Sequence, residues 1–252
     1  MDDRTIKKAR IIIPTFRYIQ IAESLLDWIG KEKIKPGTRL PPERELSQSL
    51  GVNRATLRQA LNILEEQGLI FRRQGQGTFV AEPKIERQAG KLVPFTKSMQ
   101  KKGYLIEGRL IAFEKITTEA FLADELQISI GQPAYFIHRL RMINHEPVLI
   151  EKLIVPEKYF PNMDQFDLAS RSLYEVMEHE YDVSVIHARQ SLEPVVATEY
   201  ESELLGINPG APLMLERRLA YDQYARPVER ARDLFRGDRF RFVTEMAPLD
   251  FT

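Results

Sequence analysis

The chain of 252 residues contains no cysteine and no long apolar run. The lack of cysteine excludes disulfides, thiolate metal sites and cysteine nucleophiles, and it suits a reducing compartment. A membrane-spanning helix needs about 18 apolar residues in a row, and the N-terminal ARIIIPTF is far shorter. The same segment does not have the pattern of a signal peptide. We therefore expect a cytoplasmic protein with no membrane partner.

Signatures of catalysis and of metal binding are also missing. The four histidines show no metal-ligand spacing such as HExxH and are interpreted as structural or surface residues: His138, His145, His179 and His187. The GQG at 75–77 lacks the strand–loop–helix setting and the lysine of a phosphate-binding loop. No Ser-His-Asp set or carboxylate pair can be assigned to one cleft from spacing. The sequence thus predicts no enzyme, no metal and no cofactor.

Charge is balanced over the whole chain but not between its two parts. Residues 1–90 contain 16 basic and 11 acidic residues, whereas the remainder contains 20 basic and 25 acidic residues. A basic part beside an acidic part is expected when one domain meets a polyanion and the other does not. The length and a hydrophobic content of 43% favour two globular domains.

Three helices are predicted near the N-terminus. The segment 16–29 has apolar residues at helical spacing, and a second helix follows Pro41-Pro42 and ends before Gly51. Asn53 is a suitable N-cap for the third helix, which stops at Gly68. The apolar stripe of this third helix must face the core and consists of Leu57, Ala60, Leu61 and Leu64. The stripe leaves a different face for Arg54 and Arg58.

A β-hairpin is predicted directly after the third helix. Two β-favouring runs, 69–73 and 78–80, flank Gln74-Gly75-Gln76-Gly77, where glycine supplies the turn geometry. Three helices followed by such a hairpin form the winged helix-turn-helix arrangement. We place this DNA-binding domain at residues 14–81.

Several polar residues of this domain are candidates for contact with double-stranded DNA. Arginines at the start of an exposed helix can reach phosphates or guanine edges, and a glycine at the wing tip allows close backbone approach. The candidates from this reasoning are Arg44, Arg54, Arg58, Arg72 and Gly75. Each arginine alone could be a solvated surface residue, but the ordered set beside a wing favours DNA binding.

The same stretch resembles a known family. The block PGTRLPPEREL at 36–46 and the block GVNRATLRQAL at 51–61 are similar to the N-terminal domain of the GntR superfamily of bacterial transcription regulators. The resemblance implies DNA contacts by Arg44, Arg54, Thr56 and Arg58, with Gln74 and Gly75 at the wing. Asn53 completes the set assigned to DNA.

The rest of the chain is predicted to be a linker, residues 82–91, and an α+β domain, residues 92–252. The linker has few large apolar side chains. Residues 118–141 align with residues 198–220, and each copy reads as a short helix, a Gly-x-Pro turn and a strand. Pro147-Val148 and Pro227-Val228 extend the match. We expect both copies to contribute strands to one antiparallel sheet.

Two arginines in the first of these strands indicate a binding site. Alternation over residues 135–143 puts Arg139 and Arg141 on one face with apolar neighbours, where a lone cation is costly. An anionic ligand could pair with them. Glu151 or Glu229 could equally do so, as an internal ion-pair network. Ser172 could offer a hydroxyl to a ligand or cap the helix that follows it.

This second part resembles the HutC subfamily, whose effector module is the UTRA domain with a chorismate-lyase-like fold. The matching pieces include LVPFTKSMQKKG, FIHRLRMINHEPVLIEKLIVP, SLYEVMEHEY and RPVERARDLFRGDRFRF. In that subfamily these places line a pocket for a small, often anionic effector. Carried over, they imply effector binding by Thr96, Arg139, Arg141, Glu151, Ser172, Tyr174 and Glu229.

The sequence therefore predicts a metabolite-responsive repressor. A homodimer would read a palindromic operator, and a phosphosugar, carboxylate or phosphonate would bind the C-terminal domain and alter operator binding. Two alternatives stay open. The C-terminal domain could be an enzyme tethered to DNA, or it could serve only for dimerisation.

Overall fold

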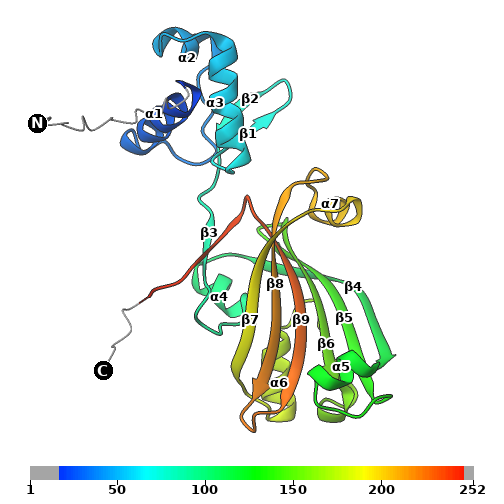
Figure 1. Ribbon diagram of the computed structural model, residues 1–252. Helices are drawn as coiled ribbons and strands as arrows, with labels where there is room; N and C mark the ends of the chain where they lie inside the picture. The colour runs from blue at the N-terminus through cyan, green and yellow to red at the C-terminus, as the bar shows by residue number, and fades with distance from the viewer. Residues whose placement is uncertain (1–16, 247–252) are drawn as a thin grey trace, which may run out of the picture. The chain divides into compact units, whose positions relative to one another are not determined.

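The computed structural model describes residues 17–246. The chain divides into two compact units, and the boundary between them in the sequence lies between Pro83 and Lys84. Each unit has its own buried core. Figure 1 shows the N-terminal helices and hairpin in blue and cyan, and the C-terminal sheet in green to red. Residues 14–16 of the predicted first domain and 247–252 of the second lie outside the described residues.

The N-terminal unit is a winged helix-turn-helix, as predicted. Its elements are α1 (Arg17–Lys31), α2 (Glu43–Ser49), α3 (Arg54–Glu66), β1 (Ile70–Arg73) and β2 (Gly77–Val80). The apolar stripe of α3 is fully buried, and it packs with residues of α1, α2 and the hairpin. β1 and β2 pair antiparallel, which forms the wing.

The turn between α2 and α3 has the local geometry that the sequence predicts. Gly51 adopts a φ of 62°, a left-handed conformation that favours glycine. Asn53 caps α3, because its Oδ1 accepts a hydrogen bond from the backbone N–H of Thr56 at 2.8 Å. The helix break therefore lets α2 and α3 cross and fixes the direction in which α3 starts.

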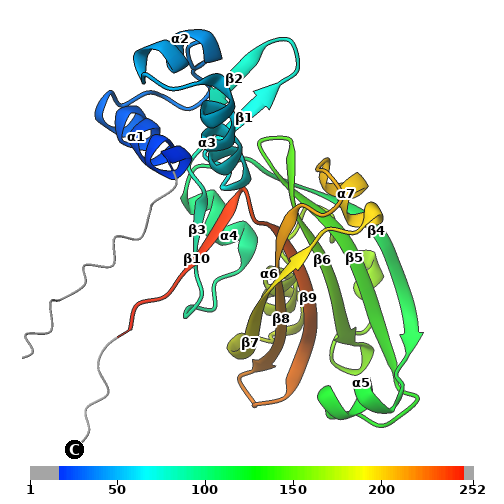
Figure 2. The same cartoon turned by 45° about the horizontal axis from the view of Figure 1, so that its top comes forward.

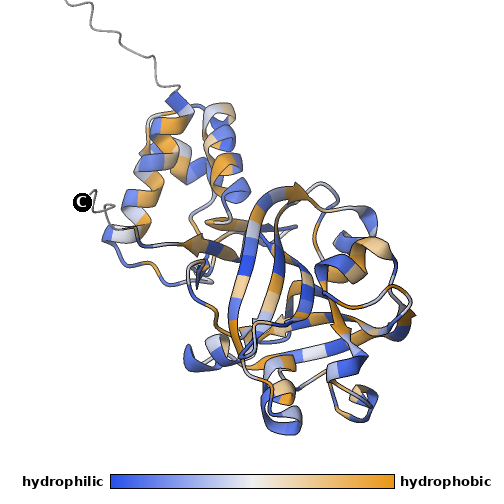
Figure 3. Cartoon of the chain, turned by 60° about the horizontal axis from the view of Figure 1, so that its bottom comes forward, coloured by the Kyte–Doolittle hydropathy of each residue, from blue (hydrophilic) through white to orange (hydrophobic). Residues whose placement is uncertain are grey.

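The C-terminal unit is built on one six-stranded antiparallel sheet with the strand order β4-β5-β6-β9-β8-β7. The strands are β4 (Ile106–Thr117), β5 (Pro133–Ile143), β6 (Glu146–Pro156), β7 (Val185–Val196), β8 (Pro212–Asp222) and β9 (Pro227–Arg236). This confirms the predicted α+β class with an antiparallel sheet. Orange and blue residues alternate along these strands, as expected for a sheet with different surroundings on its two faces (Figure 3).

The internal repeat explains the strand order. One copy runs β4, α5 (Ala120–Glu125), β5 and β6, and the other runs β7, α7 (Glu199–Leu205), β8 and β9. The two copies meet through β6 and β9 at the centre of the sheet. Strands of both copies thus join one sheet, as the sequence predicts, and the edges are the first strand of each copy.

The two faces of the sheet are covered by different helices. On one face α6 (Leu173–Tyr181) packs against β5, β6 and β9 through a cluster that includes Ile137, Leu153 and Val176. On the other face α7 packs through a cluster that includes Leu140, Ile150 and Leu205. Two short 3-10 turns, Glu157–Tyr159 and Met163–Gln165, connect β6 to the segment before α6.

The structure differs from the prediction in the segment expected to be a linker. Residues Ile85–Gln88 form β3, which pairs in parallel with β10 (Phe240–Val243), and α4 (Phe95–Lys101) follows (Figure 2). Ile85 is buried in a cluster with Phe95 and Phe240. A polar segment can be ordered in this way because its partner strand supplies backbone hydrogen bonds from far along the chain.

Within residues 17–246, none of the helices is long and apolar enough to cross a membrane.

Candidate functional site

The first candidate site is the surface of α3 and the wing. Among the predicted DNA contacts, Thr56 is half-buried, and the other side chains or backbone positions are exposed: Arg44, Asn53, Arg54, Arg58, Arg72, Gln74 and Gly75. The burial of the apolar stripe turns Arg54 and Arg58 outward from the first turn and a half of α3. A helix start of this kind can enter a major groove.

Arg54 and Arg58 differ in their surroundings. In the described range neither the Arg54 side chain nor the Arg44 side chain makes a hydrogen bond or an ion pair. The Nε of Arg58 lies 2.7 Å from Oε2 of Glu43, and the Arg58 side chain is 64% exposed. An exposed ion pair of this type contributes only about 0–1 kcal/mol, so a DNA phosphate or base can replace Glu43.

Two other predicted contacts are held by their neighbours. The Thr56 hydroxyl donates to Oδ1 of Asn53 at 2.9 Å, so both side chains help to cap α3. The Nη1 of Arg72 lies 2.6 Å from Oε2 of Glu65 and also donates to Oδ1 of Asn62. The Arg72 guanidinium is therefore directed toward α3, and the predicted contact of Arg72 with DNA requires this ion pair to open.

The wing tip is formed by Gln74, Gly75 and Gln76. Gly75 has a φ of 72°, and the space around the position of a Cβ atom is open. The guanidinium of Arg73 lies 5.3 Å and 5.4 Å from the ring centroids of Phe71 and Phe79. The wing thus has a glycine turn at its tip, and the guanidinium of Arg73 is held over two phenylalanine rings.

The second candidate site is a cavity on the α6 side of the large sheet. Of the seven predicted effector contacts, six line this cavity: Thr96, Arg139, Glu151, Ser172, Tyr174 and Glu229. They come from α4, β5, β6, α6 and β9 and from the residue before α6. The structure therefore brings together residues from segments that are up to about 130 positions apart. Arg141 is not among the lining residues but donates a hydrogen bond to Thr96, which lines the cavity.

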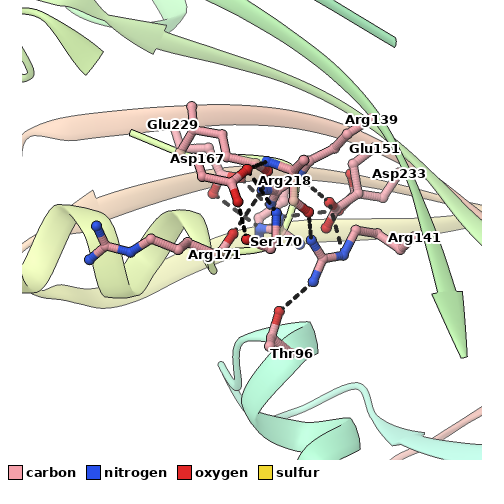
Figure 4. Close-up of polar contacts among 12 residues, drawn as sticks. Thr96, Arg139, Arg141, Glu151, Asp167, Ser170, Arg171, Arg218, Glu229 and Asp233 are labelled. Carbon is pink, nitrogen blue, oxygen red and sulfur yellow. Dashed lines mark hydrogen bonds and ion pairs between the residues drawn. The ribbon is translucent and has the colours of Figure 1, made fainter. Parts of the chain in front are cut away.

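Arg139 is part of an internal ion pair. Its Nε donates to Oε2 of Glu151 at 2.5 Å, and its Nη1 donates to the carbonyl oxygens of Leu168 and Arg171 at 2.8 and 3.3 Å. Figure 4 shows Arg139 next to Glu151. The internal partner that the sequence left open is therefore Glu151. The pair fixes the guanidinium at the wall of the cavity.

Arg141 supports the wall from behind. Its Nη1 donates to the carbonyl of Ala169 at 3.0 Å. Its Nη2 donates to the Thr96 hydroxyl at 2.6 Å, and its Nε has no hydrogen-bond partner but lies 4.0 Å from Oε2 of Glu151 (Figure 4). Burial lowers the pKa of Arg141, and the nearby Glu151 carboxylate opposes this effect. The loop around Ala169 can approach β4 closely because residue 108 is a glycine. A Cβ atom at this position would lie 1.9 Å from the Ala169 oxygen.

Ser172 and Tyr174 place hydroxyl groups at the start of α6. Ser172 is the N-cap residue, but its side chain makes no cap hydrogen bond. The hydroxyl therefore does not have the structural role that the sequence allowed. The Tyr174 hydroxyl donates to Oε2 of Glu229, and burial raises the pKa of this tyrosine well above its ordinary value.

Sequence reasoning missed a second charged group in the same cavity. Arg218, Glu216 and Asp233 line it, together with Arg87 from β3. The Nη1 and Nη2 atoms of Arg218 lie 2.8–3.2 Å from carboxylate oxygens of Glu216, Glu229 and Asp233. The repeat offers a signal, since Arg218 follows Arg139 by 79 positions, close to the repeat offset.

Burial and charge shift the pKa values of these groups in different directions. Burial alone would raise the pKa of Glu151, but Arg139 and Arg141 lower it below its usual value. Burial raises the pKa of Asp233 well above its usual value, and its neighbouring carboxylates reinforce this against the effect of Arg218. The cavity therefore contains one carboxyl group, Glu151, whose charged form is favoured, and another, Asp233, whose neutral form is favoured. Among the described residues no cluster of His, Asp and Glu could hold a metal ion.

Both units of the chain match families of known proteins. Residues 101–241 match the UTRA domain, and residues 17–80 match the description "Bacterial regulatory proteins, gntR family". The chain is 36% identical to the HTH-type transcriptional repressor NagR of Bacillus subtilis over 229 residues, which are 91% of this chain and 94% of that protein. It is 29% identical to the mannosyl-D-glycerate transport/metabolism system repressor MngR of Escherichia coli, with 90% and 94% covered.

A solved structure shows the same architecture. The crystal structure of PhnF from Mycobacterium smegmatis matches with a TM-score of 0.65 and 27% identity, over 90% of this chain and 99% of that chain. The match covers residues of both units of this chain.

Proposed function

The chain belongs to the GntR family of bacterial transcription regulators, with the UTRA effector-binding domain typical of the HutC subfamily, and on this basis we propose how it reads DNA and responds to a metabolite. It is a transcriptional repressor of the GntR/UTRA type and not an enzyme. The alternative of a DNA-tethered enzyme is therefore set aside.

We propose that α3 enters the major groove of a palindromic operator and that the chain acts as a homodimer. The observation that supports this most is the placement of Arg54 and Arg58 outward on the first turns of α3, beside a glycine-tipped wing. Two copies related by a two-fold axis would present two such helices to half-sites about one helical turn apart or a multiple of it.

Substitution of Arg54 by Ala should weaken operator binding. We expect a loss of about 1–3 kcal/mol if the guanidinium contacts a base edge, because no residue of the protein replaces the lost bond. Fluorescence anisotropy with the operator measures this affinity at several salt concentrations. If Arg54 contacts a phosphate instead, the slope of the logarithm of the binding constant against the logarithm of the salt concentration should become smaller by about one in the variant.

The matched control is Arg189→Ala. Arg189 is exposed on β7, in the other unit, so its removal changes the net charge equally without touching α3. Its affinity for the operator should equal that of the unmodified protein. Equal losses in both variants would mean that Arg54 acts only through overall charge, and no loss in Arg54→Ala would exclude it from the interface.

We propose further that the cavity of the C-terminal unit binds a small effector of the phosphosugar, carboxylate or phosphonate class. Thr96, Arg139 and Ser172 supply hydrogen-bond donors at its wall, and the buried charges there can recognise polar groups that water would otherwise solvate. The relative MngR is named for mannosyl-D-glycerate, a sugar that carries a carboxylate. This is consistent with the proposed class.

The position of the cavity suggests how binding could reach the DNA-binding unit. Residues 87–89 and 91–96 line the cavity, and they lie a few residues after the boundary between Pro83 and Lys84. A ligand that contacts this segment more favourably in one arrangement shifts the population toward that arrangement. The short connection that precedes β3 is the proposed pivot.

Arg139→Ala should abolish the effector response and leave operator binding unchanged. Because loss of one partner of a buried ion pair is costly, Ser172→Ala serves as a milder second variant whose hydroxyl makes no cap bond. A thermal-shift panel of phosphosugars, carboxylates and phosphonates identifies a ligand, and anisotropy then measures operator release. If neither variant changes the response, the ligand binds elsewhere.

The remaining alternative is a C-terminal unit that only dimerises. It predicts that no member of the panel changes the melting temperature or the operator affinity. The cavity with its buried polar wall argues against it, since a purely structural module would be expected to fill this space with apolar side chains.

A further inference from the structure

The cavity contains a row of three buried carboxylates on adjacent strands. Glu151 of β6 is directly opposite Asp233 of β9, and Asp233 is directly opposite Glu216 of β8. Their exposed fractions are 5%, 2% and 1%. Directly opposed side chains in an antiparallel sheet have Cβ atoms about 4.5–5.5 Å apart, and like charges at this distance repel each other. Three charges in this row therefore need nearby cations.

The cations are distributed unequally along the row. At one end, Arg139 pairs with Glu151 alone, and Arg141 lies 4.0 Å from the same carboxylate. At the other end, the single guanidinium of Arg218 is shared by three carboxylates, those of Glu216, Glu229 and Asp233. Figure 4 shows Arg218 beside Glu229 and Asp233. The part of the cavity formed by β8 and β9 is thus rich in carboxylate.

Neighbouring elements reduce this excess only in part. Arg87 of β3 lies 3.7 Å from Oε2 of Glu216, an atom that has no hydrogen-bond partner. Tyr174 of α6 donates to Glu229. Oδ1 of Asp233 is buried and has no partner, although an ionised carboxylate oxygen normally accepts hydrogen bonds. Two arginines therefore face three carboxylates, and Asp233 has only the shared guanidinium of Arg218, at 3.2 Å from its Oδ2.

We propose that the effector is a zwitterion whose ammonium group binds to Asp233 beside Glu216, while its anionic group binds at the Arg139 and Thr96 end of the cavity. This deepens the proposed function and rests on it. A buried carboxyl that shares one cation with two other carboxylates favours its protonated form. Binding is then an exchange, in which the Asp233 carboxyl loses its proton to solvent and the carboxylate pairs with the ammonium.

The surroundings of Asp233 agree with a bound proton before exchange. The groups that act on it are Glu151, Glu216, Glu229 and Arg218, with Arg87, Arg139 and Tyr174 one group further away. Burial is the largest influence and raises its pKa, and the three carboxylates raise it further against Arg218. Burial and the neighbouring carboxylates thus favour the neutral acid, and an ammonium group competes with its proton.

Isothermal titration calorimetry of the full-length protein tests the exchange with two small probes. 2-Aminoethyl phosphate carries both charges, whereas ethyl phosphate has the same anion and lacks the ammonium. We expect the amine to bind at least tenfold more tightly at pH 7.5. Titrations in two buffers of different ionisation enthalpy should show that it releases about one proton and that ethyl phosphate releases none.

The matched variant is Asp233→Asn, which keeps the size of the side chain but cannot exchange a proton. It should bind both probes equally and release no proton, and Glu216→Gln, which leaves Asp233 in place, should retain the proton release. Equal binding of the two probes by the unmodified protein overturns the proposal, as does binding of neither. Operator binding is measured on the same protein samples. Failure of the unmodified protein to bind the operator would contradict the proposed role of α3 in DNA binding, and it would not bear on the ammonium site.

Discussion

Arg218→Ala should destabilise the C-terminal unit by about 3–5 kcal/mol. The guanidinium is the only side chain that pairs with all three of Glu216, Glu229 and Asp233 among the described residues, and its side chain is 9% exposed. Its removal would leave buried carboxylates without their common cation, and this costs far more than the loss of an exposed ion pair. The high pKa of Arg218, which its carboxylate neighbours raise against the effect of burial, agrees with a permanently charged group.

Urea unfolding measures this loss. The single tryptophan, Trp28, lies in α1, so its fluorescence follows the N-terminal unit, whereas far-UV circular dichroism also follows the large sheet. Only the transition of the sheet should move in Arg218→Ala. The control is Arg217→Ala, next in the chain, whose side chain is 47% exposed and pairs with Glu193. It should change stability by less than about 1 kcal/mol. If both variants lose a similar amount of unfolding free energy, Arg218 does not stabilise the unit as the shared cation of the buried carboxylates.

The C-terminal unit should also lose stability between pH 6.5 and pH 4 because of His138. This imidazole is buried on the α7 side of the sheet, its Nε2 has no partner, and Lys152 is opposite it on β6. Burial and then the charge of Lys152 lower its pKa to about 4. The folded protein therefore favours the neutral ring, whereas the unfolded chain takes up a proton near pH 6.5.

The sign and size of the effect follow from these two values. The contribution of the neutral ring is complete above pH 6.5 and is lost as the pH falls toward 4, to a total of about 3 kcal/mol. Urea unfolding at a series of pH values measures it. His138→Gln has no titrating ring and should flatten the curve over this window. If the variant keeps the full acid sensitivity of the unmodified protein, other groups cause it.

The N-terminal unit could be predicted from the sequence almost completely. Its helices are defined by local patterns, such as the stripe of α3, the Asn53 cap and the left-handed glycines, and its core forms between segments close in the chain. The direction of Arg72 was not predictable, because its contact with Asn62 and Glu65 depends on how β1 packs on α3.

The C-terminal unit shows where such reasoning stops. The repeat and the alternation in β5 predicted one antiparallel sheet and a buried arginine face, and Glu151 was correctly among the possible partners. The parallel pairing of β3 with β10 was missed, since residues 85–88 lack an apolar pattern and their partner lies more than 150 positions away.

By itself the sequence determined the two-unit organisation, the family and the residues that α3 presents, because these depend on periodicity, capping and turn chemistry along short segments. Only the tertiary structure decided which charges share the cavity. The register of β6, β9 and β8 places Glu151, Asp233 and Glu216 side by side, and burial there makes each charge depend on its neighbours. Pairing of distant strands and low solvent access are properties of the assembled sheet, and no local pattern encodes them.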